Sequence, residues 1–372
     1  MRILYITRKF LPSIGGMQTQ SYEFYNALQK KVQVHLVAWG HAQKYLPIFI
    51  VIALCKSVYY LVRYDIDVIQ LGDLVLSPIG LVLKCLFNKK TLAMAHGKDV
   101  AFNNVVYKNV VLSSAKKLDG IVCVSEFLRQ RLEARGANKE KLFVNPNGIN
   151  TAEYDDVFDR GRSKQQLEIK FGIRLFERKI LLAVTRLVRK KGIAEFIKNI
   201  FPEIVKNHPD TVFLMAGGPG SGEASKEKKD IIALVAEQGL QDNICFLGDV
   251  TDRKMLLKQI YSAADLYVMP NRHIETDFEG FGIVALEAAI NTLPVVAFGV
   301  DGIPDAVKNG GNGVLVPEDD DAEFVRVVKE FLDDTDKRLS FGAKARKFVQ
   351  ENYNWDKITG AYLEILGKIT VG

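Results

Sequence analysis

Short β-rich runs alternate with helical stretches along the first half of the sequence, and this alternation restricts the fold more than any other feature. Strands that are each followed by a helix form a parallel sheet, because the helix carries the chain back before the next strand starts. We expect strands at residues 3–6, 32–37, 68–71, 91–95, 120–124 and 142–145. A polar, charged stretch at 151–176 predicts a linker, and buried strands at 180–184, 211–216 and 265–269 repeat the pattern. The sequence therefore predicts an α/β protein with two domains, at 1–160 and 161–352.

The composition agrees with a folded protein whose charge is unevenly distributed. The 372 residues suffice for two cores, and 48% hydrophobic with 25% charged residues excludes a disordered chain. Residues 1–150 carry 20 Lys and Arg against 9 Asp and Glu, a net charge of +11, whereas the whole chain has +6. Such a basic half suits an anionic lipid surface or an acidic saccharide, and no nucleic-acid motif is present. A solvated lysine-rich face is the alternative interpretation.

The four cysteines show no spacing typical of a metal site or a disulfide framework. Because Cys55, Cys85, Cys123 and Cys245 are widely separated, we expect reduced, mostly buried thiols of a cytoplasmic protein. We expect no signal peptide, because Arg2 leads straight into an apolar strand.

The most apolar stretch lies at residues 45–64, with an uninterrupted apolar run at 48–54. This run is too short to span a bilayer, and Lys56 and Arg63 interrupt the pattern. A buried helix is the interpretation that we favour. The alternative is a helix that dips into a membrane surface through its aromatic and basic side chains, which would make the protein peripheral on the inner face of the cell membrane.

Two glutamates eight residues apart, Glu279 and Glu287, bracket the turn Gly280-Phe281-Gly282 and an apolar run. The first is expected just before a helix and the second about two turns inside it. The two glycines leave the first-turn amides open to an anionic group such as a phosphate. Glu287 has apolar neighbours and needs a hydrogen-bond donor, which a pair of sugar hydroxyls would supply. Alternatively, Glu279 caps the helix and Glu287 pairs with a basic side chain.

Several polar residues follow the predicted strands, where open α/β sheets place their ligands. Gly15 and Gly16 precede a helix, and their backbone can approach a diphosphate or sugar closely or simply form a turn. His96 follows the strand at 91–95; a single histidine there is more often structural than catalytic. Asp99 could orient the loop, contact an acceptor or cap a helix.

Arg186 and Lys191 follow the first strand of the second domain. Two fixed cations there would neutralise the charge that builds on a departing diphosphate, and a solvated basic loop is the alternative. The glycine-rich stretch around Gly218 fails the dinucleotide fingerprint, because the sixth position is Glu223 and Pro219 lacks an amide donor. We therefore expect no nicotinamide cofactor.

These motifs together resemble the retaining glycosyltransferases of the GT-B fold, in particular glycosyltransferase family 4. The resemblance covers most of the chain and rests on Gly15-Gly16, His96-Gly97-Lys98-Asp99, Pro146-Asn147-Gly148-Ile149, Arg186 with Lys191-Gly192, the Glu-x7-Glu element, and Leu293-Pro294-Val295-Val296-Ala297. It implies two Rossmann-like, doubly wound parallel-sheet domains that face a cleft. It also implies that the first domain takes the acceptor, that the second takes the nucleotide sugar, and that a last helix at 353–372 packs back on the first.

The resemblance implies roles for individual residues. Glu279 and the backbone amides of Gly280, Phe281 and Gly282 would contact the transferred sugar, and Glu287 would bind the ribose. Arg186 and Lys191 would hold the diphosphate, His96 a sugar hydroxyl, and the backbone of Val250 the base. Gly15, Gly16 and Asp99 would contribute to substrate binding.

The implied reaction moves a hexosyl group from a UDP- or GDP-sugar to a hydroxyl of a saccharide or lipid-linked acceptor, with retention of configuration and without a metal or other cofactor. Such a reaction would belong to cell-surface polysaccharide or glycolipid synthesis. A sugar-nucleotide epimerase or phosphorylase of the same fold is the first alternative, followed by a nicotinamide-dependent enzyme and a non-catalytic nucleotide-binding module. The sugar, the nucleotide, the acceptor and the oligomeric state stay open.

Three positions depart from the pattern of the family. Many relatives have a small residue and Gly where this chain has Asn291-Thr292, and Gly-Gly where it has Asp301-Gly302. Asp305 stands where Glu is usual. The resemblance places all three near the phosphate side of the site, so they bear on the choice of donor more than on the class of reaction.

Overall fold

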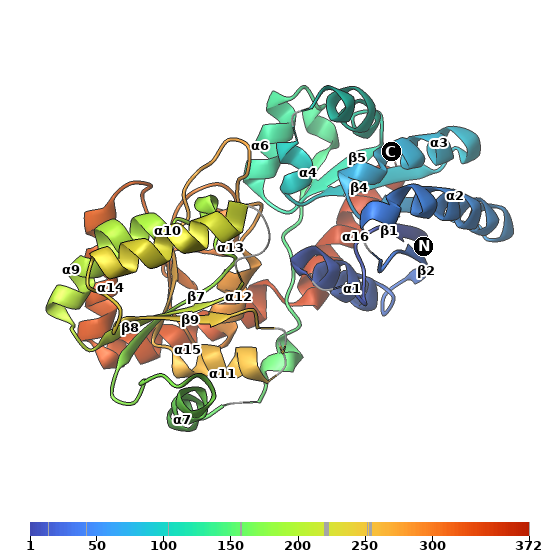
Figure 1. Cartoon of the computed structure of the whole chain (residues 1–372). Helices are drawn as coiled ribbons and strands as arrows, with labels where there is room; N and C mark the ends of the chain where they lie inside the picture. Colours follow the sequence, from blue (N-terminus) through green and yellow to red (C-terminus); the bar gives the residue numbers. More distant parts are fainter. Residues whose placement is uncertain are drawn as a thin grey trace. The chain divides into compact units, whose positions relative to one another are not determined.

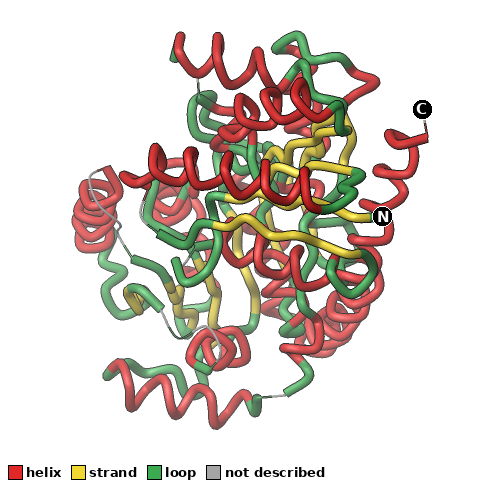
Figure 2. The backbone as a smooth tube through the Cα atoms, turned by 90° about the vertical axis from the view of Figure 1, so that its right-hand side faces the viewer, coloured by secondary structure: helices red, strands yellow, loops and turns green. Residues whose placement is uncertain are grey.

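The computed structural model describes residues 1–13, 15–41, 43–102, 104–156, 158–218, 223–250, 252 and 255–371, and it divides into two compact units. Unit 1 comprises Met1–Asn150, Glu275–Phe281 and Asn352–Gly372, and unit 2 comprises Thr151–Ile274 and Gly282–Glu351. Each unit is a parallel sheet with flanking helices, as Figures 1 and 2 show, so the predicted α/β Rossmann-like fold is confirmed.

The sheet of unit 1 has the strand order β2-β1-β3-β4-β5-β6 in the described part of the chain. Its strands are β1 (Arg2–Thr7), β2 (Gln33–Ala38), β3 (Val68–Leu71), β4 (Lys90–Ala95), β5 (Gly120–Cys123) and β6 (Leu142–Val144). All six pair in parallel, with Ile3 beside Val34 on one side and Val68 on the other. Because β1, β3 and β4 are largely buried, they read as mainly apolar runs in the sequence.

The helices of unit 1 include one from the far end of the chain. They are α1 (Gly16–Leu28), α2 (Leu46–Arg63), α3 (Ser77–Phe87), α4 (Lys98–Ala101), α5 (Ser113–Ala115), α6 (Glu126–Ala134) and α16 (Trp355–Val371). Figure 1 shows the red α16 beside the blue α1, and the two helices pack against each other. Tyr362 and Leu366 of α16 lie in one core with Ile3 and Tyr5 of β1. The last helix is therefore part of the core of unit 1.

Two expectations about unit 1 are wrong. Helix α2 is not a buried helix, because it covers the sheet with one face while Val51 and Val62 on the opposite face are 61% and 75% exposed. The cysteines are not mostly buried: the residues at positions 55 and 85 are exposed and only Cys123 is fully buried, although all four thiols are free. Both expectations treated apolar composition as evidence of burial, and a chain has too little polar surface for that rule to hold everywhere.

The sheet of unit 2 has the order β12-β11-β10-β7-β8-β9. Its strands are β7 (Lys179–Val184), β8 (Thr211–Ala216), β9 (Ile244–Gly248), β10 (Leu266–Met269), β11 (Val295–Phe298) and β12 (Gly313–Val316). Its helices are α7 (Arg160–Phe171), α8 (Ile193–Glu195), α9 (Phe201–Asn207), α10 (Glu223–Glu237), α11 (Leu256–Ala263), α12 (Ile283–Ile290), α13 (Ile303–Ala306), α14 (Asp321–Asp333) and α15 (Thr335–Asn352). Counted from β7, this is the doubly wound order of dinucleotide-binding folds.

The polar stretch that was expected to be a linker contains helix α7. Asp159 caps this helix by accepting a hydrogen bond from the Arg162 amide at 2.7 Å, and Gly172 ends it in the left-handed conformation. Leu167 is fully buried, and α7 packs against α11. The chain passes from unit 1 to unit 2 at Asn150, so most of the predicted linker belongs to unit 2.

Candidate functional site

The carboxyl edge of the sheet in unit 2 brings the loops after β7 and β10 together. These two strands are neighbours, and the chain continues from β7 to one side of the sheet and from β10 to the other. Open α/β sheets bind ligands at such a switch point. Arg186 and Lys191 follow β7, and the Glu-x7-Glu element follows β10. The order of the strands therefore collects the predicted cations and the start of α12 at one edge.

Gly192 allows the two loops to approach each other. It has φ of 64°, and a Cβ atom at this position would lie 1.8 Å from the carbonyl oxygen of Pro270. The Arg272 amide donates a hydrogen bond to the carbonyl of Lys190 at 3.0 Å. The loop that carries Lys191 is thus held against the loop after β10. The side chain of Arg186 is exposed and makes no ion pair with the residues that the structure describes.

The first turn of α12 offers backbone amides to a ligand. Gly282 is the N-cap residue, with φ of 89°, and no side chain caps the helix. Helix α12 begins at Ile283, so its first amides have no partner within the helix. The N-cap position is held by Gly282, three residues after Glu279. An exposed helix start of this kind suits an anion.

Glu287 is the fifth residue of α12, closer to the helix start than the two turns expected from the sequence. It is 6% exposed, and its Oε2 accepts a hydrogen bond from the hydroxyl of Tyr261 at 3.1 Å. A buried carboxylate needs such a donor. Tyr261 was missed because nothing in the sequence connects α11 with α12. The ribose contact of Glu287 stays a prediction.

The loops after β8 and β9 pack closely beside the loop after β7. Gly217, with φ of 138°, donates its amide hydrogen to the carbonyl of Gly248 at 2.8 Å, and a Cβ atom on Gly217 would lie 2.0 Å from the Thr185 carbonyl oxygen. Val250 follows β9 and is half-buried. The rest of the glycine-rich stretch, at 219–222, lies outside the described residues. The position of Val250 beside these loops is compatible with the predicted base contact, which stays untested.

Arg272 and His273, which follow β10, form their side-chain contacts within unit 2. Arg272 forms ion pairs with Asp319 at 2.7 Å and Asp321 at 2.6 Å, and its guanidinium lies 4.2 Å from the ring centre of Phe298. The Nδ1 atom of His273 lies 2.5 Å from the carboxylate of Asp301. These contacts give the loop a fixed shape.

In unit 1, His96 lies at the carboxyl end of β4 and its loop is held by a buried carboxylate. Asp99 accepts hydrogen bonds from the amides of His96 at 3.0 Å and Gly97 at 2.8 Å. It orients the loop, while Gly97 is the residue that precedes α4. The Nε2 atom of His96 lies 3.0 Å from the carbonyl oxygen of Gly72. Because a carbonyl oxygen only accepts hydrogen bonds, Nε2 must carry the hydrogen. In the neutral ring, Nδ1 can then accept a hydrogen bond from a ligand hydroxyl.

The segment Glu275–Phe281, which carries Glu279, clusters with unit 1. Gly280 lies so close to the His96 loop that a Cβ atom on it would be 1.9 Å from the His96 carbonyl oxygen. The ring of Phe278 packs edge-on against Phe127 at 5.0 Å, and Phe281 is buried. Glu279 is therefore brought to the loop of His96, although 182 residues separate the two positions in the numbering.

Basic side chains gather at the switch point of unit 1, between β1 and β3. Gly15 is the N-cap residue of α1, and the exposed Gly16 begins that helix. The buried Asp73 forms an ion pair with Arg8 at 2.7 Å; burial raises its pKa and Arg8 acts against that rise. Burial lowers the pKa of Lys9, and the charges of Arg8 and Lys98 lower it further. Cations crowded in this way would bind an anion favourably.

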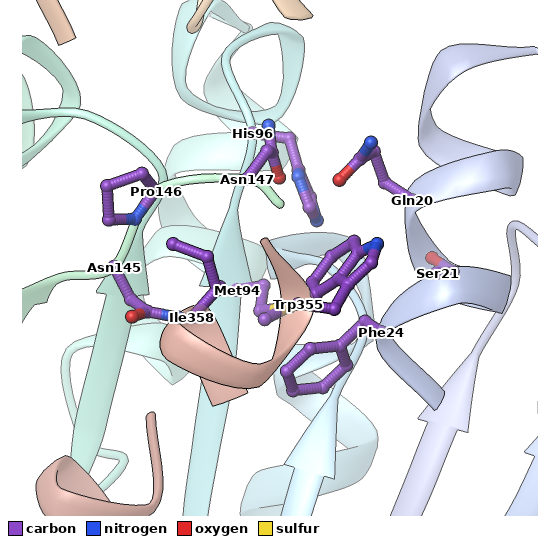
Figure 3. Close-up of a pocket in the computed structure, with 10 residues that line it drawn as sticks. All are labelled: Gln20, Ser21, Phe24, Met94, His96, Asn145, Pro146, Asn147, Trp355 and Ile358. Carbon is purple, nitrogen blue, oxygen red and sulfur yellow. The ribbon is translucent and has the colours of Figure 1, made fainter. Parts of the chain in front are cut away.

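A small cavity lies beneath His96 (Figure 3). Its volume of about 10 Å³ is that of a single water molecule. The buried amide oxygens of Gln20 and Asn145 accept no hydrogen bond from the described residues. The cavity is lined by Gln20, Ser21, Phe24, Met94, His96, Asn145, Pro146, Asn147, Trp355 and Ile358. Figure 3 shows the Gln20 amide oxygen turned toward His96, whereas Asn145 lies at the far end of the cavity. The described residues include no group of three or more metal-ligating side chains.

Both halves of the sequence match known glycosyltransferase families. Residues 165–348 match the family Glycosyl transferases group 1, and residues 14–153 match Glycosyltransferase Family 4. The chain is 24% identical to the GDP-mannose-dependent alpha-(1-6)-phosphatidylinositol monomannoside mannosyltransferase of Mycobacterium tuberculosis over 98% of both sequences. It is 29% identical to the D-inositol 3-phosphate glycosyltransferase of Nocardia farcinica over 59% of this chain and 46% of that protein. In structure it resembles HepE of Anabaena in complex with UDP, with a TM-score of 0.74, 17% identity, and 99% and 100% of the two chains covered.

Proposed function

The chain belongs to the family 4 glycosyltransferases of the GT-B fold, and from this premise we propose that it transfers a hexosyl group from a nucleotide diphosphate sugar to a hydroxyl of a lipid-linked or saccharide acceptor. We propose further that the configuration at the anomeric carbon is retained. The product would enter glycolipid or cell-surface polysaccharide synthesis, on the cytoplasmic side of the membrane.

The observation that carries the donor assignment is the pairing of an exposed cation with an uncapped helix start at one sheet edge. Arg186 has no carboxylate partner in the described chain, and α12 begins behind Gly282 without a side-chain cap. Both follow adjacent strands, β7 and β10. A guanidinium and open amides bind a phosphate group from two directions. Lys191 would add a second charge as the diphosphate leaves.

The remaining donor contacts are proposed from the resemblance to the family. Glu287, held by Tyr261, would accept hydrogen bonds from the ribose hydroxyls, and the backbone at Val250 would meet the base. Glu279 and Nδ1 of His96 would contact hydroxyls of the sugar. In the front-face mechanism usually proposed for such enzymes, the departing phosphate takes the proton of the acceptor hydroxyl. The chain then needs no side chain as an obligatory base.

The acceptor would carry a phosphate. Two relatives act, by their names, on phosphatidylinositol monomannoside and on D-inositol 3-phosphate. In this chain Lys9 and Lys98 lie near Arg8, whose own charge is paired with Asp73, so this cluster has a net positive charge. Because a phosphate diester or monoester is anionic, these side chains support an acceptor of that chemistry over a neutral saccharide.

Calorimetric titration with UDP, GDP, ADP and NAD tests the proposal. We expect one nucleoside diphosphate to bind at micromolar strength, and we expect Arg186→Ala and Glu287→Ala each to weaken it about tenfold or more, roughly 1.4 kcal/mol. Arg174→Ala removes an exposed arginine of unit 2 away from the site and should leave binding unchanged.

Binding of NAD alone, or an unchanged dissociation constant for Glu287→Ala, would contradict the donor assignment. Incubation of the nucleotide sugar with and without acceptor separates transfer from epimerisation, because an epimerase forms product without an acceptor alcohol. The anomeric proton of the product, observed by NMR, then reports retention or inversion.

A further inference from the structure

Helix α2 exposes an apolar face. Its outward residues recur every three or four positions, so they share one side of the helix. They are Ile48, Val51, Ile52, Cys55, Val58, Tyr59 and Val62. The 18 residues of the helix have a mean hydropathy of 1.7, and α2 is long and apolar enough by composition alone to cross a membrane. A helix on the surface of a sheet usually has a polar outer face, which α2 lacks.

The opposite face of α2 is attached to the sheet of unit 1. Phe49 is fully buried and its ring stacks on Trp39 at 5.5 Å. The ring of Tyr60 lies 5.0 Å from that of His35 on β2. A helix that crossed a bilayer would have to give up these contacts and uncover the sheet. The packing therefore favours a helix that lies along a surface.

The apolar surface continues beyond α2. Helix α3 packs against α2 and against the turn Tyr107–Leu112, and Figure 1 shows α2 and α3 side by side. Val82 and Leu86 of α3 are exposed, and so are Val105, Val106 and Val110 before and within the turn. We call these five residues, together with the outward residues of α2, the α2–α3 face. An exposed apolar surface of several neighbouring elements marks an interaction site.

The charges around this face are mainly positive. Residues 44–117 contain ten Lys and Arg against four Asp. Asp73 and Asp99 are buried, Asp65 forms an ion pair with Lys89 at 3.3 Å, and Asp67 accepts a hydrogen bond from the Arg2 amide at 2.7 Å. The ten cations therefore outnumber the two exposed carboxylates, Asp65 and Asp67, both of which already have partners.

Two of the exposed cations lie on α2 itself. Lys56 and Arg63 are seven residues apart, which places both along one border of the apolar stripe. Long basic side chains at such a border can reach the headgroups of anionic lipids while the apolar residues enter the acyl region. This complementarity of charge favours an anionic lipid membrane as the partner of the face.

We propose that the α2–α3 face docks the protein on an anionic lipid membrane. The inference deepens the proposed function, because a lipid-linked acceptor would lie in the same membrane. The apolar residues of α2 enter the interface between headgroups and acyl chains, and Lys56 and Arg63 bind the lipid phosphates. A second copy of the chain is the rival occupant and is an outcome of the test.

Co-sedimentation of the full chain with vesicles measures the docking directly. We expect binding to vesicles of phosphatidylcholine with phosphatidylglycerol, much weaker binding to phosphatidylcholine alone, and loss of binding at 0.5 M salt because screening shortens the range of the charges to roughly 4 Å. Val51→Ser/Tyr59→Ser/Val62→Ser should lower the partition coefficient about tenfold or more. Its matched control, Ile169→Ser/Phe176→Ser/Leu339→Ser, removes three exposed apolar side chains of unit 2 and should change it less than about twofold.

Separate variants test the contribution of the basic side chains and the depth to which α2 enters the membrane. Lys56→Gln/Arg63→Gln should weaken binding to anionic vesicles about thirtyfold, because each basic residue near the surface contributes about fivefold. In Tyr59→Trp, lipids with brominated acyl chains should quench the fluorescence of the new indole. The quenched fraction should therefore exceed that of the wild-type protein, which has two tryptophans. Ile169→Trp on α7 should not be quenched beyond wild type.

The outcomes separate this proposal from its rivals and from the proposed function. The docking proposal would be overturned if the wild-type protein did not bind anionic vesicles. It would also be overturned if the triple variant on α2 bound them as tightly as the wild type. A dimer in solution that the same triple variant converts into a monomer would assign the face to a second copy instead. Failure of the calorimetric titrations with intact vesicle binding would remove the donor assignment and leave the docking surface standing.

Discussion

At the scale of single residues, two departures from the family pattern coincide with an unusual backbone conformation. Thr292 has φ of 63° and Asp301 has φ of 54°. Both occupy positions where many relatives have glycine. Left-handed backbone costs a branched side chain free energy, because its Cβ crowds the following carbonyl oxygen. Asp301 gains a partner in His273, whereas the side chain of the exposed Thr292 gains none in the described chain.

Thr292→Gly should therefore stabilise the protein. Removal of the side chain relieves the left-handed strain, and the greater freedom of glycine in the unfolded chain offsets part of the gain. We expect the free energy of unfolding of unit 2 to rise by about 1 kcal/mol, or about 2–4 °C in Tm, measured by calorimetry. The neighbouring Asn291 has φ of −89° and donates a hydrogen bond to the Glu287 carbonyl, so Asn291→Gly is the control and should destabilise. A lower Tm for Thr292→Gly would contradict the assignment of strain.

At the scale of elements, α16 is the element whose packing matters most for unit 1. Its residues Tyr362, Ile365, Leu366 and Ile369 complete the core over β1, β3 and β4. Phe24 of α1 packs edge-on against Tyr362 at 5.0 Å, and the Tyr362 hydroxyl donates to Oε1 of Gln70 at 2.5 Å. Apolar surface on both α1 and the sheet is covered by this last helix, so unit 1 depends on residues at both ends of the chain.

Tyr362→Ala should destabilise unit 1 by about 3–5 kcal/mol, because it removes a large buried ring and leaves a cavity and an unpaired Gln70. Urea unfolding followed by tryptophan fluorescence measures the change, since both tryptophans belong to unit 1. Glu364→Ala changes an exposed residue of the same helix and should cost less than about 0.5 kcal/mol. A cost below 1 kcal/mol for Tyr362→Ala would mean that α16 covers the core only loosely.

At the scale of the whole molecule, each unit has its own switch point and its own set of loops. In unit 1 the switch point lies between β1 and β3, where Arg8, Lys9 and Asp73 gather. In unit 2 it lies between β7 and β10, where Arg186 and the start of α12 gather. The proposed division of labour, with the donor on unit 2 and the acceptor on unit 1, is the one that the family resemblance implies, and cations at both switch points suit two anionic ligands.

Hydrogen exchange with a saturating nucleoside diphosphate tests this division. At about 100 times the dissociation constant, the ligand should stabilise the unit that binds it by about 2.7 kcal/mol. We expect slower exchange at residues 185–192 and 283–287 and unchanged exchange in β5 and β6, which serve as the internal control. The same experiment with Arg186→Ala should show less protection. Protection confined to unit 1 would reverse the proposed roles.

Strand positions and the chemistry of individual motifs could be read from local sequence. Strands buried on both faces, such as β8 and β10, consist mainly of apolar side chains, so their runs stand out. The expected bounds of the six strands of unit 1 and of β7, β8 and β10 agree with the observed ones to within one residue, whereas no bounds were predicted for β9, β11 and β12. The position of Gly282 at a helix start and that of Arg186 after a strand could be predicted for the same reason, because both are local patterns.

Long-range packing set the features that local patterns could not reveal. Tyr261 beside Glu287, Gly280 against the His96 loop and Asp73 beside Arg8 join residues that are distant in sequence. Helix α2 is a further example. Its composition predicts an apolar helix, but only the packing of Phe49 against the sheet determines which face is buried. Periodicity reports a residue's preference for burial, whereas the partner that buries it depends on how the whole chain folds back on itself.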